Sequence, residues 1–181
     1  MLRSRRAGTF SRGPLNASVR CPVPSSYSCQ GIQFTIPDDW KVVEDDLDEV
    51  IRAITIDASP GGYCMIDLYR SDQAPSLDGY IEGQLVHYKK ALPGRLRMVG
   101  EPLKAPEQTV RRGQDIEGVR VRLDIRGILA RHPDLNSFFR IELGEHTGMF
   151  SLRCPEGEFE TLRPKFHALI ETFESRRSQV S

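Results

Sequence analysis

Apolar and polar residues alternate along several short segments of the chain, a pattern typical of half-buried β-strands. The first such segment, residues 32–36, places Ile32, Phe34 and Ile36 on one face and polar side chains on the other. The clearest is the segment 119–126, in which apolar and charged residues alternate strictly over eight positions. Similar patterns predict further strands at about 41–44, 50–57, 63–70, 95–103, 107–112, 137–143 and 148–154.

Two segments instead show the spacing of three and four residues that is typical of amphipathic helices. The first is predicted to run from an N-cap at Ser76 to about Ala91. The second carries a broad apolar stripe near the end of the chain, and it contains Pro164. We place its start near Thr161, because proline is tolerated in the first turn of a helix.

The order of these elements predicts a single α+β domain over residues 31–175, with an antiparallel β-sheet flanked by helices. A chain of 181 residues has room for one substantial core. Residues 1–30 lack periodicity and form a predicted leader, and residues 176–181 form a short tail. The leader holds five arginines before the first acidic residue, Asp38. Its composition resembles that of an organellar transit peptide. A disordered tail and upstream codons included by a misassigned start remain alternatives.

The overall charge is balanced, with 25 basic and 25 acidic residues. Such a chain has no global field that attracts nucleic acid or an anionic membrane, and we expect no nucleic-acid partner. No run of about 18 apolar residues occurs, so no membrane span is expected.

The four cysteines show neither a CxxC pair nor the spacing of metal ligands. Cys64 and Cys154 occupy apolar positions of predicted strands, where we expect buried thiols. Cys21 and Cys29 lie in the leader and would pair only in an exported protein. The simplest expectation is a cytoplasmic protein, or an organellar one if the leader is a transit peptide.

The alternation also exposes a candidate binding surface that is rich in arginine. Charged side chains occupy the face of residues 119–126 that is opposite to the apolar one. The corresponding alternate positions of the two following predicted strands hold further arginines. If these strands pair as a meander, they place one cluster on one sheet face, which consists of Arg120, Arg122, Arg126, Arg140 and Arg153. A solvated face with cross-strand ion pairs is one interpretation. A docking surface for an acidic or amphipathic protein partner is the other.

Motifs of common enzymes are missing from the sequence, which has no GxSxG, GxxxxGK[ST] or post-strand GxGxxG segment. Cys154 and His167 are a conceivable thiol and base, but Cys154 has the parity of a core residue. Glu142, Glu145 and His146 lie close together in a predicted hairpin loop, which we interpret as solvated. We therefore expect no catalytic residue, no metal site and no cofactor.

The sequence resembles the PsbP-like superfamily, which includes the photosystem II extrinsic subunit, the Ran-binding Mog proteins and the bacterial DcrB-like proteins. The resemblance covers about residues 31–175. It rests on Phe34-Thr-Ile-Pro37 with Trp40, on the closing strand Met149–Cys154, and on the helix end Leu169-Ile-Glu-Thr-Phe173. It implies an α/β/α sandwich whose role is binding or assembly.

The function that follows is a non-catalytic binding, adaptor or assembly domain, with a DcrB-like chaperone or adaptor for a secreted effector as one form. A small-ligand-binding protein or an enzyme with a cavity between sheet and helix is an alternative. An organelle-targeted, photosystem-type assembly factor is another. The identity of the partner and the oligomeric state stay open at this point.

Overall fold

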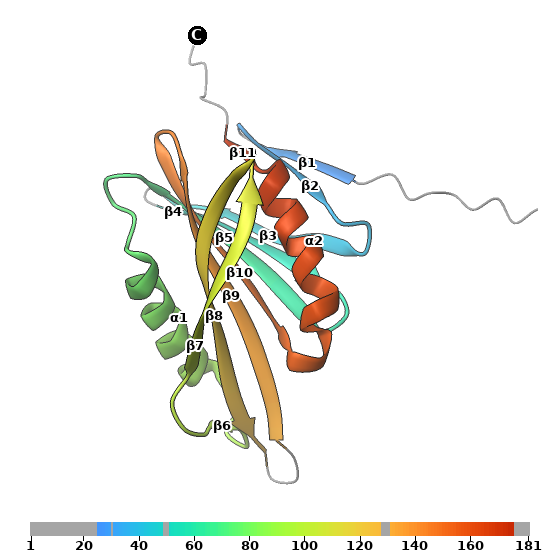
Figure 1. Ribbon diagram of the computed structural model, residues 1–181, viewed down its shortest axis with the longest axis vertical. Helices are drawn as coiled ribbons and strands as arrows, with labels where there is room; N and C mark the ends of the chain where they lie inside the picture. Colours follow the sequence, from blue (N-terminus) through green and yellow to red (C-terminus); the bar gives the residue numbers. More distant parts are fainter. Residues whose placement is uncertain (1–24, 30, 49–50, 128–130, 176–181) are drawn as a thin grey trace, which may run out of the picture.

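The computed structural model describes residues 25–29, 31–48, 51–127 and 131–175 (Figure 1). Its main element is an antiparallel sheet of eight strands. In spatial order these are β3 (Trp40–Leu47), β4 (Ile51–Ala58), β5 (Gly62–Arg70), β10 (His146–Pro155), β9 (Arg131–Leu143), β8 (Gln114–Arg126) and β6 (Arg97–Met98), with β7 (Leu103–Arg111) also paired to β8. A smaller sheet consists of β1 (Ser25–Cys29), β2 (Ile32–Ile36) and β11 (Glu174–Ser175).

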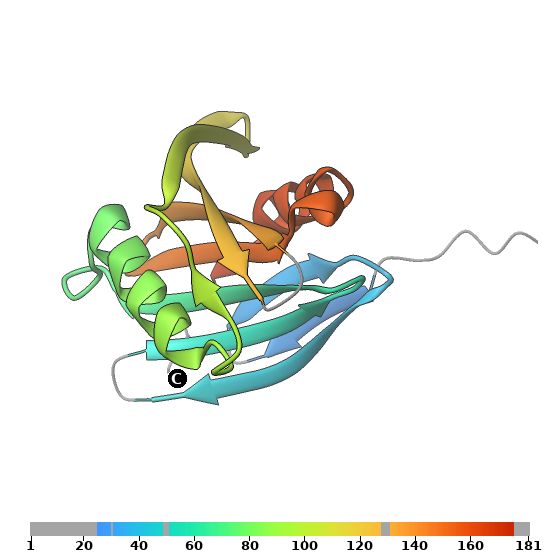
Figure 2. The same ribbon diagram turned by 90° about the horizontal axis from the view of Figure 1, so that it is seen from below.

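Two helices lie on opposite faces of the main sheet, which is curled (Figure 2). The helix α1 (Leu77–Ala91) covers one face, called here the α1 face. The helix α2 (Phe159–Thr172), which follows a 3-10 turn η1 (Glu156–Glu158), covers the other, the α2 face, together with the smaller sheet. The predicted single α+β domain with an antiparallel sheet is therefore confirmed. The predicted sandwich fits only loosely, because strands as well as a helix cover the α2 face.

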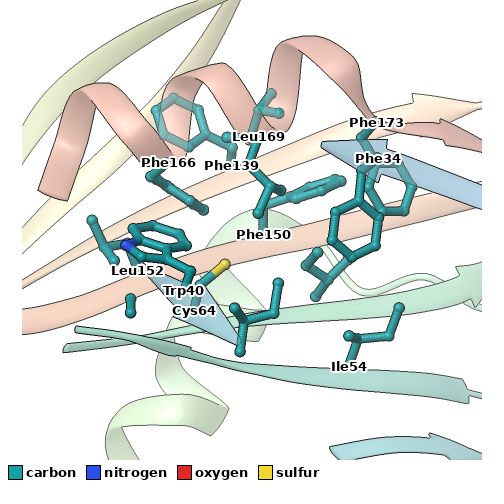
Figure 3. Close-up of a cluster of buried hydrophobic side chains, with 14 of the residues drawn as sticks. Phe34, Trp40, Ile54, Cys64, Phe139, Phe150, Leu152, Phe166, Leu169 and Phe173 are labelled. Carbon is teal, nitrogen blue, oxygen red and sulfur yellow. The ribbon is translucent and has the colours of Figure 1, made fainter. Parts of the chain in front are cut away.

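The core on the α2 face joins both ends of the described chain (Figure 3). The ring of Phe173 stacks on that of Phe34, with centroids 5.3 Å apart, and meets that of Phe150 edge-on at 4.9 Å. Trp40 is also buried in this core. The three segments that carried the resemblance thus pack against one another, which explains why they are rich in apolar residues.

A second core lies between α1 and the α1 face of the sheet. Ile81 is fully buried there and packs in one cluster with Leu123 and Met149. The predicted N-cap is confirmed, because Ser76 Oγ accepts a hydrogen bond of 3.1 Å from the backbone N–H of Gly79. Neither α1 nor α2 is long and apolar enough to cross a membrane, and they are the α-helices of the described ranges.

The second helix begins earlier than predicted. It starts at Phe159, not near Thr161, so Pro164 lies inside the helix and not in its first turn. Phe159 is fully buried and anchors the extra turn in the α2-face core. The backbone carbonyl of Glu160, which would otherwise accept a bond from position 164, belongs to an exposed residue, and water can satisfy it.

Several predicted strand boundaries were also wrong. The predicted strand 95–103 is divided into β6 and β7, and the break contains Gly100 with φ 74° and Pro102. The strand predicted at 137–143 begins six residues earlier, at Arg131. The predicted leader overlaps β1, which pairs with β2. Residues 1–24 and 176–181, including Cys21, lie outside the described residues.

Candidate functional site

The five arginines of the predicted cluster do not share one face of the sheet. Arg120, Arg122 and Arg126 lie on the α2 face, whereas Arg140 and Arg153 lie on the α1 face. The expectation of a single arginine face was therefore wrong.

The strand register explains this separation. Arg122 of β8 lies directly opposite Leu135 of β9, which belongs to the α2-face core. Arg153 of β10 lies opposite Asn136, the next residue of β9. Because successive residues of a strand point to opposite faces, Arg122 and Arg153 must do so as well. The sequence correctly predicted which residues share a face within each of these strands. It did not show which residues of neighbouring strands lie opposite each other.

The arginines on the α2 face differ in how they are neutralised. The guanidinium of Arg120 lies 5.7 Å from the centroid of the Phe159 ring. Arg122 pairs with both Glu156 (Nε to Oε1, 2.7 Å) and Asp124 (Nη1 to Oδ1, 3.1 Å). Arg126 is exposed and has no ion pair within the described part of the chain.

Arg126 is also the centre of a row of three arginines across three adjacent strands. Arg97 of β6 lies directly opposite Arg126 of β8, and Arg126 lies directly opposite Arg131 of β9. Residues that are directly opposite share a face, and their Cβ atoms are about 5 Å apart. We call Arg97, Arg126 and Arg131 the arginine row. It crosses the end of β8 next to β6, at the bottom of Figure 1.

Few carboxylates accompany this row. Asp124 accepts from Arg131 (Nη2 to Oδ2, 2.5 Å) and also pairs with Arg122, so it is shared by two arginines. The row and Arg122 together form what we call the arginine cluster. Among the described residues, the ion pairs of its four guanidinium groups use two carboxylates, those of Asp124 and Glu156. The cluster therefore carries a local positive charge although the whole chain is neutral.

Like charges at such positions repel. Two unit charges about 6 Å apart repel by about 0.7 kcal/mol in water and by about 3 kcal/mol at an effective dielectric of 20. The backbone ladder fixes the register of the row, and sliding a strand by one residue would expose its buried face. An exposed apolar side chain, Leu103 of β7, lies directly opposite Arg122 and borders the cluster. This end of the sheet can thus offer both guanidinium donors and an apolar contact.

The two arginines on the α1 face are held in interactions with other residues. Arg153 lies with its guanidinium carbon 3.6 Å from the centroid of the Tyr88 ring, and its Nη2 lies 3.0 Å from Asp134 Oδ2. The hydroxyl of Tyr88 donates to the same oxygen at 3.0 Å, and burial raises the pKa of Tyr88. Arg140 pairs with Glu142. Arg153 therefore ties α1 to the sheet and is less available to a partner than Arg126.

A small pocket lies beside Arg153, between α1 and the sheet. Its volume is about 30 Å³, and its lining includes Met65, Leu85, Asn136, Phe138 and Ser151. Pockets that bury a drug-sized ligand measure about 300–1,000 Å³. A cavity between sheet and helix thus exists, but it is far smaller than such a ligand.

The conceivable pair of Cys154 and His167 has no support in the geometry. Both Cys64 and Cys154 are buried, as predicted, and desolvation raises the pKa of the Cys154 thiol to about 12. The ring of His167 meets that of Phe139 edge-on at 5.6 Å, and its Nε2 lies 3.6 Å from Glu107 Oε1.

In the described ranges, no three His, Cys, Asp or Glu side chains are placed to hold a metal ion. Of the hairpin residues considered for such a site, Glu142 pairs with Arg140 and accepts a hydrogen bond of 2.8 Å from the Thr147 hydroxyl.

Sequence reasoning missed Arg97 and Arg131. Arg131 was assigned to the loop before a strand that starts at 137, and Arg97 to the first part of the longer predicted strand 95–103. A signal for Arg131 was present, because a hairpin centred on residues 128–129 would place it opposite Arg126. For Arg97 no local signal existed, since β6 has only two residues and its pairing is set by the tertiary fold.

Comparison with protein-family models and with curated proteins finds no match. Comparison with solved structures finds the cyanobacterial PsbP protein (CyanoP) of Synechocystis, with 14% identity and a TM-score of 0.51 over 90% of this chain and 98% of that one. The Ran-binding protein Mog1p of Saccharomyces cerevisiae shares 9% identity over 84% of this chain and 96% of its own, with a TM-score of 0.39. LpqN of Mycobacterium tuberculosis, described as involved in cell envelope biogenesis, shares 14% identity over 86% of each chain, with a TM-score of 0.37.

The last two TM-scores are too low to carry an argument, and identities of this size speak for the fold only. The match to CyanoP extends over nearly the whole of both chains. This chain has the PsbP-like fold.

Proposed function

We propose that this protein is a non-catalytic binding domain whose arginine cluster docks an acidic segment of a partner protein. The observation that carries the proposal is the arginine row. Arg126 of β8 lies directly opposite Arg97 of β6 on one side and Arg131 of β9 on the other, and the described residues supply the row with a single paired carboxylate, Asp124. An acidic partner would replace the repulsion within the row by attraction.

The chemistry of arginine favours carboxylates as the docking groups. Its planar guanidinium donates two parallel hydrogen bonds to one carboxylate, which lysine cannot do. Arginine is also enriched at the centres of protein interfaces, next to apolar residues that exclude water. The exposed Leu103 beside Arg122 is such a residue. The partner segment should therefore combine acidic side chains with at least one apolar side chain.

A nucleic acid fits this surface less well. Asp124 and Glu156 lie within the cluster and would repel phosphate groups. The chain as a whole has no net charge, and a nucleic-acid-binding domain is usually basic over an extended face.

The PsbP-like fold is compatible with a binding domain, but it does not indicate which residues bind the partner. The specific form that we propose is an adaptor or chaperone for a secreted effector, the role implied by the DcrB-like resemblance. In that form the effector carries the acidic segment, and the domain releases it at high ionic strength because exposed charges are screened.

Site-specific photo-crosslinking tests the proposal. A photoreactive phenylalanine analogue is placed at Leu103, which is 60% exposed beside the cluster, or at Val86, which is 55% exposed on α1 and serves as the matched control. In the native host, position 103 should capture a protein with an acidic segment that position 86 does not capture. The crosslink should disappear when Arg126→Glu and Arg131→Glu are combined. A crosslink that persists in this double variant would contradict the proposal.

A further inference from the structure

The pocket beneath α1 contains a buried polar group that no other described residue satisfies. Asn136 of β9 is 6% exposed, and its side-chain Nδ2 has no hydrogen-bond partner among the residues that the structure describes. The side chain of Asn136 lines the pocket together with those of Met65, Leu85, Phe138, Ser151 and Arg153. Buried amide groups nearly always find an acceptor. Gln84 and Ser151 also line the pocket, but neither accepts from Asn136 Nδ2 in this structure, so this donor is available to a group that enters the pocket.

The surroundings restrict the charge of that missing group. The one cationic side chain at the pocket, Arg153, already contacts Asp134 Oδ2 through Nε at 3.2 Å and Nη2 at 3.0 Å. Its Nη1 donates to the hydroxyl of Tyr63 at 2.7 Å. Because its charge is matched by Asp134, the pocket attracts neither an anion nor a cation strongly. The group that satisfies Asn136 should be a neutral acceptor.

The walls and the size restrict its shape. Met65, Leu85 and Phe138 line the pocket with apolar side chains from β5, α1 and β9. The volume of about 30 Å³ leaves room for a head group of a few heavy atoms. A carbonyl with one or two attached carbon atoms has this size, one acceptor and an apolar remainder.

We propose that the α1 pocket is a binding site for a small neutral carbonyl or amide group, which accepts a hydrogen bond from Asn136 Nδ2. The group belongs either to a free small molecule or to a side-chain amide of a partner. The site is independent of the arginine cluster, because Asn136 faces α1 and the cluster faces α2.

Amide-resolved NMR of the full chain tests this site with defined probes. Acetone and N-methylacetamide carry the acceptor, and methylammonium, of similar size, carries only donors. The two carbonyl probes should shift the side-chain NH₂ signals of Asn136 saturably, and methylammonium should not. Asn136→Leu should abolish saturable shifts at neighbouring Ser151, and Asn136→Asp should reverse the preference toward methylammonium. Thermal unfolding of each variant checks that it is folded, and the Leu variant keeps the test valid if the Asp variant is not.

Two outcomes would overturn the proposal. One is a persistent cross-relaxation signal between water and the Asn136 amide at saturating acetone, which would mean that a resident water fills the pocket. The other is an equal probe response at Ser151 in Asn136→Leu. A third probe, N-acetylglutamine methylamide, distinguishes a partner's side-chain amide from a free small molecule as the natural ligand. If it binds more tightly than N-methylacetamide, the site takes a partner's side chain. If it binds equally or more weakly, the site takes a free molecule.

Discussion

Arg126 lies directly opposite Arg131 on neighbouring strands, and within the described residues only Arg131 of the two pairs with a carboxylate, that of Asp124. Ile125, next to Arg126 on β8, and Leu135, four residues after Arg131 on β9, are buried on opposite faces of the sheet, which holds the register in place. The repulsion between the two guanidinium groups is therefore a fixed property of the fold. It has a consequence for stability as well as for binding.

Reversing the central charge of the row should stabilise the isolated protein. Arg126→Glu replaces two like-charge neighbours by two opposite-charge pairs, with Arg97 and Arg131. Each favourable cross-strand pair contributes about 0.2–1 kcal/mol. We expect the free energy of unfolding in urea to rise by about 1 kcal/mol at low salt. The gain should shrink in about 1 M NaCl, where the Debye length is about 3 Å.

Arg70→Glu is the control for the change in net charge. Arg70 forms an exposed pair with Asp72, in which the side chains are 66% and 69% exposed. Its reversal should leave stability unchanged or slightly lower. An equal gain in both variants would show that net charge matters and the row does not.

The buried pair of Arg52 and Asp45 should make stability depend on acid. Arg52 is 6% exposed and donates to both carboxylate oxygens, at 2.8 and 2.7 Å, and the Tyr27 hydroxyl also donates to Asp45. The bond from Arg52 lowers the pKa of Asp45. The pKa of Asp45 is lower in the folded state than in the unfolded state. The stabilisation that the ionised Asp45 contributes is therefore fully present above about pH 3.9, and it is lost as the pH falls through the folded-state pKa.

Arg52→Met should lower the free energy of unfolding at pH 7 by about 3 kcal/mol, because it leaves a largely buried carboxylate without its main partner. Asp45→Asn tests the pH dependence. The difference in stability between wild type and Asp45→Asn should narrow between pH 4 and pH 2.5. A difference that stays constant over this interval would contradict the assigned role of Asp45.

Asp67 should show the opposite pH dependence. Burial raises its pKa, and the Tyr80 hydroxyl donates to it at 2.7 Å. With the folded-state pKa above the unfolded one, the ionised carboxylate costs stability above the folded-state value, and this cost vanishes below about pH 3.9. Asp67→Asn keeps an acceptor for Tyr80, so it should stabilise the protein at pH 7 and be neutral at low pH. Urea unfolding of both proteins at two pH values measures this, and a gain that is larger at low pH would contradict it.

Two glycines should respond in opposite ways to alanine. A Cβ atom at Gly118 would lie 2.4 Å from the ring of Phe139, whereas at Gly83 in α1 it would meet nothing within 4 Å. Gly118→Ala should therefore cost about 2 kcal/mol through overpacking. Gly83→Ala should gain about 0.5–1 kcal/mol, since alanine is the better helix former. Thermal unfolding measures the change in stability of each variant. Changes of similar size and the same sign would contradict the close packing of Gly118 against the Phe139 ring.

The fold was largely predictable from residue patterns, because its strongest signals are local. The alternation of Ile32, Phe34 and Ile36 and the cap at Ser76 predicted elements that the structure contains. Boundaries failed where tertiary contacts outweigh local preference. Phe159 starts its helix early because it fills the α2-face core, and Pro164 is tolerated inside that helix.

The candidate site was less predictable, because it depends on strand register. The alternation around Arg122 and Arg126 correctly indicated charged residues on one side of β8. Whether Arg153 joins them depends on a shift of a single residue between strands, and a one-residue shift moves a side chain to the other face. Arg97 could not be assigned, since β6 pairs with β8 through a contact between residues far apart in the sequence.

Binding of a labelled peptide rich in glutamate and containing one leucine tests whether the arginine row docks an acidic segment. Its fluorescence anisotropy is titrated with wild type, with the combined Arg126→Gln and Arg131→Gln variant, and with Arg70→Gln as the control. We expect saturable binding to wild type that weakens with added NaCl. The double variant should bind with a Kd that is about tenfold higher or more, and the control should bind with the Kd of wild type. Equal Kd values for wild type and the double variant would contradict the assignment of the arginine row as the docking surface.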